Sequence, residues 1–395
     1  MKSVFAGEKS TVAQTDPPPP SDLPNSSDLP TSAPKVKPSD SPGKILVAAS
    51  GTGGHLFPAL ATATELQRLG YSLEWLGVPN RLETTLVADQ YPLHTVKMAG
   101  LQGRPGVRTV RLLSQCALAT RRVRKLLKQG QFSGVFTTGG YIAAPAILAA
   151  RSLGLPAVLH ESNALPGKVT RWLSPWCTTV ALGFGVAAQY LPKAQTVTVG
   201  TPVRADFLTD APPALTDPII PADVPLILIF GGSQGAVAVN QLVRQATPAW
   251  LDQGAWIIHQ TGKNDPDTDA LSHPHYIHRP FFDNMAALLY RADLAICRSG
   301  AGTLTELAIT RTPSLLIPYP AAAEDHQTIN ARVFSTAGAA QLLPQRDLTA
   351  ERLSNTVSQL LQHPDQIAAM AEAAGNMAVR DSAQKLAALV QQVMG

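Results

Sequence analysis

The segment KILVAASGTGGHLFPAL, residues 44–60, decides the fold class. Its apolar run from Ile45 to Ala49 has the length of a buried strand, and the glycine-rich Ser50 to Gly54 leads from it into a helix pattern. A strand that passes through such a turn into a helix is the opening unit of a parallel α/β sheet. We therefore predict an α/β protein with two doubly wound halves. Further strands are expected at 134–137, 157–160 and 179–182, and then at 226–230, 256–259, 293–297 and 314–317.

Composition places the boundaries between the halves. Residues 1–42 contain nine prolines and eight serines without apolar periodicity, which predicts a disordered tail. Residues 206–225 hold five prolines, so we expect the first half to span 43–200 and the second to span 201–365. The last segment, 366–395, has a helical pattern, and we expect it to pack back on the first half.

Composition also excludes several classes of protein. With 395 residues, 45% of them hydrophobic and 15% charged, the chain can bury a large core and is not a disordered protein. It has no apolar run near the roughly 18–20 residues of a spanning helix and no signal-peptide pattern, so we expect it in the cytoplasm. Cys116, Cys177 and Cys297 fit neither a disulfide framework nor a metal-ligand spacing, and we expect reduced, buried thiols.

Charge is distributed unevenly along the chain. Residues 1–42 carry 4 Lys or Arg and 5 Asp or Glu, residues 43–200 carry 16 and 5, and residues 201–395 carry 12 and 18. The first half is therefore strongly basic and the second half is acidic. This asymmetry indicates an anionic partner for the first half, namely a nucleic acid, an anionic membrane or a phosphorylated substrate, or else a solubilising surface charge.

Four predicted strands run directly into glycine-rich turns that each precede a helix pattern. In such a turn the backbone N–H groups approach a ligand closely, and the helix N-terminus adds about half a positive charge, so phosphates bind well there. One such turn is equally a plain βα connection, but two in each half favour a nucleotide-like ligand in a cleft between the halves. The turns are Ser50 to Gly54, Thr138 to Tyr141, Gly231 to Gly235 and Ser299 to Thr303.

The common nucleotide motifs do not fit these turns. A dinucleotide fingerprint that starts at Gly51 and Gly53 requires a third glycine where the chain has Leu56. None of the three Gly-Lys pairs is followed by Ser or Thr, so none is a P-loop. The stretch Asp265 to Asp269 resembles a metal-diphosphate clamp, but its Pro- and Asn-containing loop indicates a solvated turn.

Two titratable residues stand at the glycine turns. His55 falls in the first turn of a helix, whose positive end favours a neutral imidazole that can accept a proton. Its alternative role is to cap the turn. Glu306 lies about one turn into the helix that opens near Gly302, where a carboxylate can accept hydrogen bonds from a ribose diol. Its alternative role is to complement the helix dipole.

Six segments form one ordered set of motifs: SGTGGHLFPA (50–59), HESN (160–163), GTPVR (200–204), GGSQGA (231–236), RSGAGTLTE (298–306) and DHQTINA (325–331). In this order they resemble the family of bacterial N-acetylglucosaminyltransferases that convert lipid I to lipid II in peptidoglycan synthesis. The resemblance covers residues 43–395. Ser50, Ser162 and Thr201 replace the family's usual glycine, glutamine and asparagine.

The resemblance implies a fold and a reaction. The fold is GT-B, in which two Rossmann-like domains face a cleft. The reaction is an inverting transfer of N-acetylglucosamine from UDP-N-acetylglucosamine to the C4 hydroxyl of the muramyl sugar of lipid I, with no metal ion and no cofactor.

The resemblance also implies roles for individual residues. Ser233 and Arg204 would lie near the diphosphate, Glu306 would hold the ribose, and Phe282 would lie near the uracil. Gln327 and Asn330 would contact the sugar hydroxyls. The N–H donors would come from Ala301, Gly302, Thr303, Leu304 and Thr305. The first half would supply Thr52, Gly53, Gly54 and Asn163. For the base that removes the acceptor proton, we expect His55, with Glu161 and Tyr141 as further candidates.

The basic first half suggests a membrane partner for a lipid acceptor. Residues 101–130 hold eight Lys or Arg and no acid, and Leu112, Cys116, Ala119, Val123 and Leu126 recur at helical spacing. This amphipathic segment either binds anionic headgroups or packs its apolar stripe on its own core. We expect a peripheral protein on the cytoplasmic face of the plasma (inner) membrane. Its expected partners are undecaprenyl-pyrophosphoryl-muramyl peptide (lipid I) and other cell-wall synthesis proteins.

Two other functions stay open at this point. One is a related UDP-sugar transferase that acts on another lipid such as diacylglycerol, with the same donor turns and a different first half. The other is a UDP-sugar-binding protein without catalysis. We expect no nucleic acid, because the basic half lacks interleaved aromatic residues and any nucleic-acid motif.

Overall fold

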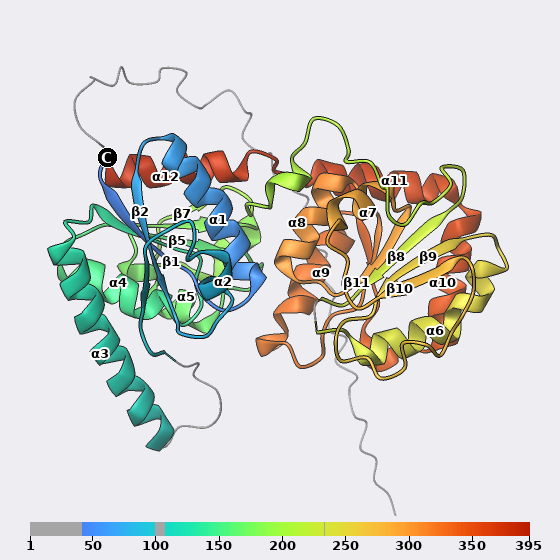
Figure 1. Cartoon of the computed structure of the whole chain (residues 1–395), viewed down its shortest axis with the longest axis horizontal. Coiled ribbons are helices and arrows are strands. Elements are labelled where there is room, and N and C mark those ends of the chain that lie inside the picture. The colour runs from blue at the N-terminus through green and yellow to red at the C-terminus, as the bar shows by residue number, and fades with distance from the viewer. Residues whose placement is uncertain (1–41, 99–106, 233) are drawn as a thin grey trace, which may run out of the picture. The chain divides into compact units, whose positions relative to one another are not determined.

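The protein is described by a computed structural model, which covers residues 42–98, 107–232 and 234–395 (Figure 1). For residues 107–111 the backbone alone is described. Residues 1–41 of the predicted tail, and Ser233, lie outside the described residues.

The first half is built on one seven-stranded parallel sheet with the order β3-β2-β1-β4-β5-β6-β7. Its strands are β1 (Lys44–Ala48), β2 (Ser72–Gly77), β3 (Leu93–Thr95), β4 (Gly134–Thr137), β5 (Ala157–Glu161), β6 (Thr179–Leu182) and β7 (Thr196–Thr198). Its helices are α1 (Gly53–Arg68), α2 (Glu83–Leu86), α3 (Val107–Gln129), α4 (Ala143–Ser152) and α5 (Lys168–Leu173), with 3₁₀ turns η1 (Ser174–Trp176) and η2 (Gly185–Tyr190).

The second half contains a six-stranded parallel sheet with the order β10-β9-β8-β11-β12-β13. Its strands are β8 (Leu226–Phe230), β9 (Trp256–Gln260), β10 (Tyr276–Arg279), β11 (Leu294–Cys297), β12 (Ser314–Leu316) and β13 (Ala340–Leu342). Its helices are α6 (Val237–Leu251), α7 (Met285–Arg291), α8 (Ala301–Thr310), α9 (His326–Thr336), α10 (Ala350–Gln362) and α11 (Pro364–Asn376), with 3₁₀ turns η3 (Ala205–Phe207), η4 (Ala323–Asp325) and η5 (Gln345–Asp347). The α/β prediction of two Rossmann-like sheets is confirmed.

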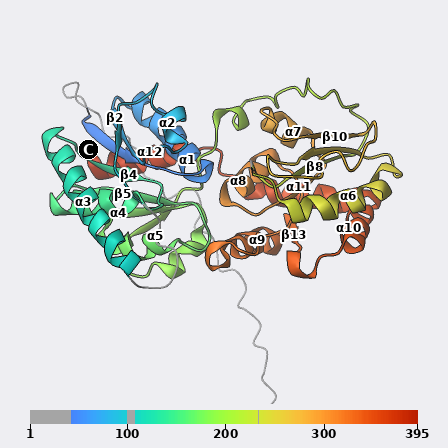
Figure 2. The same ribbon diagram turned by 60° about the horizontal axis from the view of Figure 1, so that its bottom comes forward.

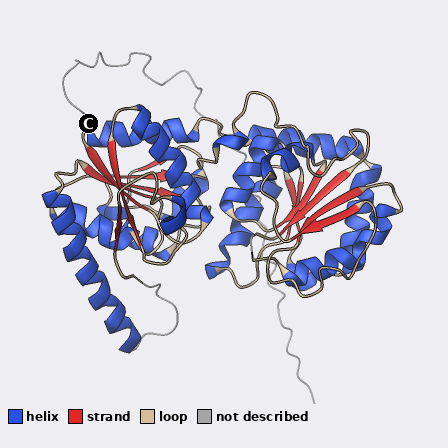
Figure 3. Ribbon diagram, in the orientation of Figure 1, coloured by secondary structure: helices blue, strands red, loops and turns tan. Residues whose placement is uncertain are grey.

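Each sheet is covered on both faces by helices (Figure 3). Successive side chains along its central strands point alternately into two apolar layers, one on each face. In β1, Leu46 and Ala48 pack with α3 and α4, while Ile45 and Val47 pack with α1. Strands that are covered on both sides read as continuous apolar runs, which is why the sequence reveals them. Figure 2 separates the α3, α4 and α5 layer from the α1 layer.

The end of the chain forms two helices. The first, α11, contacts α8, and the second, α12 (Ser382–Met394), packs on α1. Leu386, Ala387 and Val390 of α12 join the apolar layer under α1.

Of the three cysteines, Cys297 is buried, whereas Cys116 and Cys177 are half-buried, so the expectation of three buried thiols is only partly right. All three are free. Along the described residues, we find no helix that is both long and apolar enough to span a bilayer.

Candidate functional site

The four glycine-rich turns lie at the two points where the strand order reverses. In the first sheet β1 pairs with β2 on one side and β4 on the other, so the turns after β1 and β4 are neighbours. In the second sheet β8 pairs with β9 and β11, which brings the turns after β8 and β11 together. Helices leave such a switch point toward opposite faces of the sheet, and open α/β folds bind their ligands in the crevice between them.

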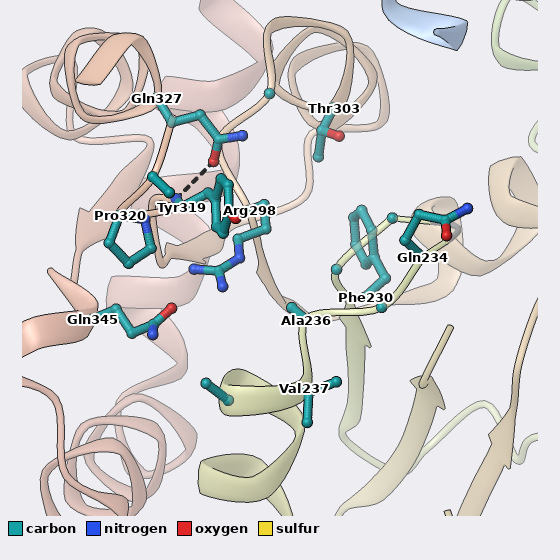
Figure 4. Close-up of a pocket in the computed structure, with 16 residues that line it drawn as sticks. Phe230, Gln234, Ala236, Val237, Arg298, Thr303, Tyr319, Pro320, Gln327 and Gln345 are labelled. Atoms are coloured by element: carbon teal, nitrogen blue, oxygen red, sulfur yellow. Dashed lines mark hydrogen bonds between the residues drawn. The ribbon is translucent and has the colours of Figure 1, made fainter. Parts of the chain in front are cut away.

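A cavity of about 700 Å³ opens at the second switch point. Its wall includes Gly231 and Gly235 after β8, Gly300 and Thr303 after β11, and Gln327 from α9 (Figure 4). This volume is in the range of a small-molecule site. Because α8 begins at Ala301, its unpaired first-turn N–H groups and its positive end belong to this region, and both favour an anionic ligand.

The predicted α8 contacts separate into three kinds. Thr303 lines the cavity, and Ala301 and Gly302 lie in the first turn of the helix. The Leu304 side chain is fully buried in the core, and the Thr305 hydroxyl donates to the Ala301 carbonyl at 3.0 Å. The Leu304 N–H donates to the Gly300 carbonyl at 3.0 Å and Thr305 lies inside the helix, so the expected N–H donors of α8 reduce to those of Ala301, Gly302 and Thr303.

Arg298 is a lining residue to which the sequence analysis gave no role. Its Nη1 donates to the carbonyls of Ile317 and Pro318, both at 2.9 Å, and its guanidinium lies 5.4 Å from the centre of the Tyr319 ring. Figure 4 shows the guanidinium between Tyr319 and Gln345. Burial lowers the pKa of Arg298 from its ordinary value, so a bound anion would compensate a partly desolvated cation.

Gln327 is fixed in the same wall. Its Oε1 accepts from the Tyr319 N–H at 2.9 Å, and its carbonyl accepts from the Ser299 hydroxyl at 2.8 Å. The side-chain NH₂ group is then the part of Gln327 that remains for a ligand.

Glu306 and Arg204 face one another at the edge of the second half. Arg204 Nη2 lies 3.6 Å from Glu306 Oε1, and Arg204 Nη1 lies 3.7 Å from Asp206. Burial raises the pKa of Glu306 to about 7, although the nearby Arg204 opposes this shift. The structure therefore places Arg204 beside the carboxylate that the resemblance assigns to the ribose.

Phe282 lies in the core rather than in the cavity wall. Its side chain is 3% exposed, and its N–H donates to Gln260 Oε1 at 3.0 Å. The neighbouring Phe281 is 57% exposed, so this aromatic ring, which the sequence analysis did not single out, is the accessible one of the pair.

At the first switch point, His55 bridges the two glycine turns. Its Nδ1 lies 2.8 Å from the Thr138 carbonyl, and the Thr138 hydroxyl donates to the His55 carbonyl at 2.9 Å. Since a carbonyl only accepts, Nδ1 carries the hydrogen, and in a neutral ring Nε2 keeps its lone pair. Cβ atoms at Gly139 and Gly140 would lie 3.6–3.9 Å from the imidazole, so the His55 ring packs directly against the backbone of these two glycines.

The other first-half residues divide by exposure. Thr52 is the exposed N-cap of α1, with Gly53 and Gly54 in the first turn of that helix. Tyr141, the last residue of the Thr138 to Tyr141 turn, is 44% exposed. Glu161 is 6% exposed and accepts four hydrogen bonds, from the N–H and side chain of Asn163, the N–H of Gly167 and the hydroxyl of Thr170. With its oxygens thus occupied, Glu161 fits the positioning of Asn163 better than the role of a base.

Asn330 is committed to protein partners. It is fully buried, its Oδ1 accepts from the Ala164 N–H at 2.8 Å, and its Nδ2 donates to Asn163 Oδ1 at 3.1 Å and to the Ser299 carbonyl at 3.2 Å. In this structure, its amide joins the loop of Asn163 to the turn after β11 rather than facing a sugar hydroxyl.

Two of the three departures from the family pattern meet at one glycine. A Cβ atom at Gly183 would lie 2.3 Å from Thr201 Oγ1 and 2.9 Å from the Ser162 carbonyl. Ser162 and Thr201 are both buried, and Gly183 is bordered by the Thr201 hydroxyl and the backbone of Ser162.

The interpretation of Asp265 to Asp269 as a solvated turn is wrong for Asp265. Its carboxylate is buried in a bidentate pair with Arg244, at 2.8 and 2.9 Å, and it accepts from Asn240 at 2.7 Å. Asn240 also donates to the Thr261 carbonyl at 2.8 Å. This network holds the loop after β9 against the Gly231 to Gly235 turn. The two segments are in close contact, because a Cβ atom at Gly262 would lie 2.1 Å from the Gly235 nitrogen.

His259 completes this network as a neutral ring. Its Nε2 donates to Asn240 Oδ1 at 3.1 Å, and its Nδ1 accepts from the Tyr276 hydroxyl at 2.8 Å. Burial lowers the pKa of His259 to about 3.

Protonation of His259 should weaken the fold in acid. The unfolded chain binds this proton below about pH 6.5, whereas the folded chain excludes it down to about pH 3, so stability falls as the pH drops through that window. In thermal melts at pH 7, 6, 5 and 4, we expect a shallower acid decline for His259→Gln than for the parent. His273→Gln, at an exposed position, is the control and should decline like the parent. Equal slopes for all three proteins would contradict this assignment.

Comparison with known proteins matches both halves. The N-terminal domain of glycosyltransferase family 28 matches residues 45–182, and the C-terminal domain of that family matches residues 226–386. The chain belongs to glycosyltransferase family 28.

The curated relatives extend over nearly the whole described chain. One from Nostoc sp. (strain PCC 7120) is 61% identical over 355 residues, which is 90% of this chain and 99% of the relative. One from Trichodesmium erythraeum is 55% identical over 89% of this chain and 93% of the relative. Both are named UDP-N-acetylglucosamine--N-acetylmuramyl-(pentapeptide) pyrophosphoryl-undecaprenol N-acetylglucosamine transferase.

Solved structures agree with this family. A crystal structure of Acinetobacter baumannii MurG is 30% identical, with a TM-score of 0.71 and coverage of 89% of this chain and 99% of that one. A glycosyltransferase of kitacinnamycin is 17% identical with a TM-score of 0.70 over 89% of this chain and 98% of that one, a likeness that concerns the fold alone.

Proposed function

We propose that this family 28 glycosyltransferase moves N-acetylglucosamine from UDP-N-acetylglucosamine to the C4 hydroxyl of the muramyl sugar of lipid I, which gives lipid II. The observation that carries the proposal is the pairing of two glycine turns at each switch point, with a 700 Å³ cavity at the second one. The names of the relatives from Nostoc and Trichodesmium support the same pair of substrates.

The donor belongs in the second half. Its diphosphate would meet the N–H groups at the start of α8, with Arg298 as a cation in the cavity wall. The Gln327 amide would donate to a sugar hydroxyl, and Glu306 would accept from the ribose. The N–H groups of α8 and the Arg298 cation are the groups that would stabilise the negative charge that develops on the departing UDP.

The acceptor and the base belong in the first half. The acceptor oxygen attacks the anomeric carbon from the side opposite the diphosphate, which inverts that carbon. The bond from carbon to the phosphate oxygen breaks, and UDP leaves with its electron pair. The acceptor proton passes to His55 Nε2, whose lone pair is free because Nδ1 donates to Thr138.

Replacement of the base should slow the chemical step. For His55→Ala we expect turnover to fall by about two orders of magnitude, the usual contribution of a general base, with little change in donor KM. Steady-state kinetics with labelled donor measures both quantities, and His273→Ala serves as an exposed-histidine control. Turnover within a few-fold of the parent would leave His55 as a turn residue only.

The ribose role of Glu306 predicts a pH effect on donor binding. Burial raises the pKa of Glu306 to about 7, and only the ionised carboxylate accepts from both ribose hydroxyls. Donor affinity should therefore be about tenfold weaker at pH 6 than at pH 8. Calorimetric titration with UDP-N-acetylglucosamine at both pH values tests this. Glu306→Gln should bind weakly at both; the same pH dependence in the variant would exclude Glu306 as its source.

The acceptor assignment has a direct competitor, because a related transferase could use another lipid. A radiolabelled donor supplied with a short-chain lipid I analogue and diacylglycerol in the same reaction discriminates them, and EDTA in a parallel reaction tests for a metal. We expect labelled disaccharide lipid in both reactions. Label in the diacylglycerol product would overturn the acceptor assignment, and donor binding without transfer would favour a binding protein.

A basic face of the first half suits an enzyme with a lipid acceptor. Among the α3 side chains that the structure describes, residues 112–129, five cations are exposed, and so are Leu113 and Leu118. Through α4, this helix shares a layer with α5 and η1, which expose Trp172 and Trp176. These rings supply the aromatic residues that segment 101–130 lacks. The exposed cations are Arg121, Arg122, Arg124, Lys125 and Lys128.

The α3 residues that are buried differ in part from the predicted apolar stripe. Ala119 and Val123 are buried as expected, but Leu127 is buried in place of Leu126, and Leu112 and Cys116 are half-buried. The packed face of α3 is therefore a core face, and any membrane contact must come from its opposite, basic side. We infer a peripheral enzyme on the cytoplasmic membrane face, where lipid I and other cell-wall synthesis proteins would meet it.

Loss of charge on α3 should weaken binding to anionic vesicles. Each surface cation adds about 1 kcal/mol, so Arg121→Gln/Arg122→Gln/Lys125→Gln should lower the partition coefficient at least about tenfold. Co-sedimentation with phosphatidylglycerol vesicles measures this. Arg332→Gln/Arg346→Gln/Arg352→Gln removes the same charge from the second half and should bind like the parent. Equal binding of the parent to neutral and anionic vesicles would refute the electrostatic contact.

A further inference from the structure

A buried carboxylate stands behind the first glycine turn. Glu83 opens α2 and is 0% exposed. Its Oε1 accepts from the Ser50 hydroxyl and from the Val78 N–H at 2.8 Å, and its Oε2 accepts from the Gly51 N–H at 3.2 Å. A buried carboxylate is costly unless donors surround it, and these three donors meet that need.

The held segment is the backbone between β1 and α1. Gly51 has a φ of +106°, a conformation that side-chain-bearing residues rarely adopt. A Cβ atom there would meet no described atom within 4 Å. Since the Cβ side of Gly51 is open, the hydrogen bonds from Ser50 and Gly51 to Glu83 are the contacts that restrain this part of the turn. Ala49, just before the turn, is fixed separately by the Trp75 indole N–H, which donates to its carbonyl at 2.9 Å.

The same segment borders the His55 ring. Thr52 follows Gly51 and accepts the His55 N–H at 3.1 Å. A Cβ atom at Gly140 would lie 3.9 Å from the Ser50 carbonyl and 3.6 Å from His55 Nε2, so the Ser50 carbonyl and the free ring nitrogen border the same glycine. A shift of Ser50 and Gly51 would therefore change the surroundings of the nitrogen that takes the proton.

We propose that Glu83 is a positioning residue for proton transfer, which it supports by holding the Ser50 to Gly54 turn in register with His55. The inference rests on the proposed function, because it assigns His55 to the acceptor step. It also explains Ser50. The family's usual glycine has no side chain, whereas the Ser50 hydroxyl supplies one of the three donors to the carboxylate.

The conservative variant Glu83→Gln tests this. An amide offers one oxygen, so its NH₂ group must face the N–H of either Gly51 or Val78, and two donors then oppose each other. We expect kcat to fall about 10- to 100-fold with donor KM within twofold of the parent, because the donor cavity lies in the other half. Glu74→Gln is the control: Glu74 is a partly buried carboxylate of the same sheet that pairs with Lys44 and His94, and this variant should keep its kcat.

A double-mutant cycle separates positioning from general destabilisation. If Glu83 acts through His55, then Glu83→Gln should cause little further loss in a His55→Ala background. The milder variant Ser50→Ala removes one donor and should lower kcat only a few-fold. The same fold-loss from Glu83→Gln with and without His55, or a rise in donor KM equal to the fall in kcat, would overturn the proposal.

The nitrogen-15 NMR spectrum of the His55 ring separates a failure of the Glu83 positioning role from a failure of the proposed function. In Glu83→Gln we expect altered His55 signals, and in Glu74→Gln we expect parent-like ones. If the parent fails to transfer sugar to the lipid I analogue, the proposed function fails whatever the spectrum shows. If the parent transfers sugar and Glu83→Gln changes neither kcat nor the His55 signals, the positioning role fails.

Discussion

The ladder between neighbouring parallel strands at each switch point is the interaction on which both parts of the site depend. In the first sheet Ala48 of β1 pairs with Thr137 of β4, and the Thr137 hydroxyl donates to the Ala48 carbonyl at 2.6 Å. In the second sheet Phe230 of β8 pairs with Cys297 of β11. In each sheet, this pairing means that the two strands end next to one another. The two glycine turns that follow are therefore neighbours, with their N–H groups at the carboxyl edge of the sheet.

Each half secures its first glycine turn with a buried acid from a later element. Glu83 follows β2 and holds Ser50 and Gly51 through direct hydrogen bonds. Asp265 follows β9, is paired with Arg244 of α6, and fixes the loop that presses on Gly235. A glycine turn gains close approach to a ligand but loses conformational restraint. The buried acids restore that restraint, Glu83 through hydrogen bonds to the turn itself and Asp265 through the loop beside the turn.

The sequence predicts the fold well where strands are apolar and central. The run Leu226 to Phe230 is covered on both faces, and its five consecutive apolar residues predict β8 from the sequence alone. In contrast, β2 carries Ser72 and Glu74 near the edge of its sheet, and β7 and β13 have three residues each, so none forms an apolar run. The glycine turns and His55 could be predicted from the sequence because these residue types are unusual directly after an apolar run. The roles of Glu83 and Asp265 could not be predicted from the sequence, because partners such as Ser50 and Arg244 lie 33 and 21 residues away and only the folded sheets bring them together.

The most direct measurement is a crystal structure of the protein with UDP-N-acetylglucosamine. We predict that the diphosphate lies at the start of α8 beside Arg298, that the ribose lies within hydrogen-bond distance of Glu306, and that the anomeric carbon faces the turn that carries His55. Donor density at the turns after β1 and β4, with the cavity between the turns after β8 and β11 empty, would contradict this prediction.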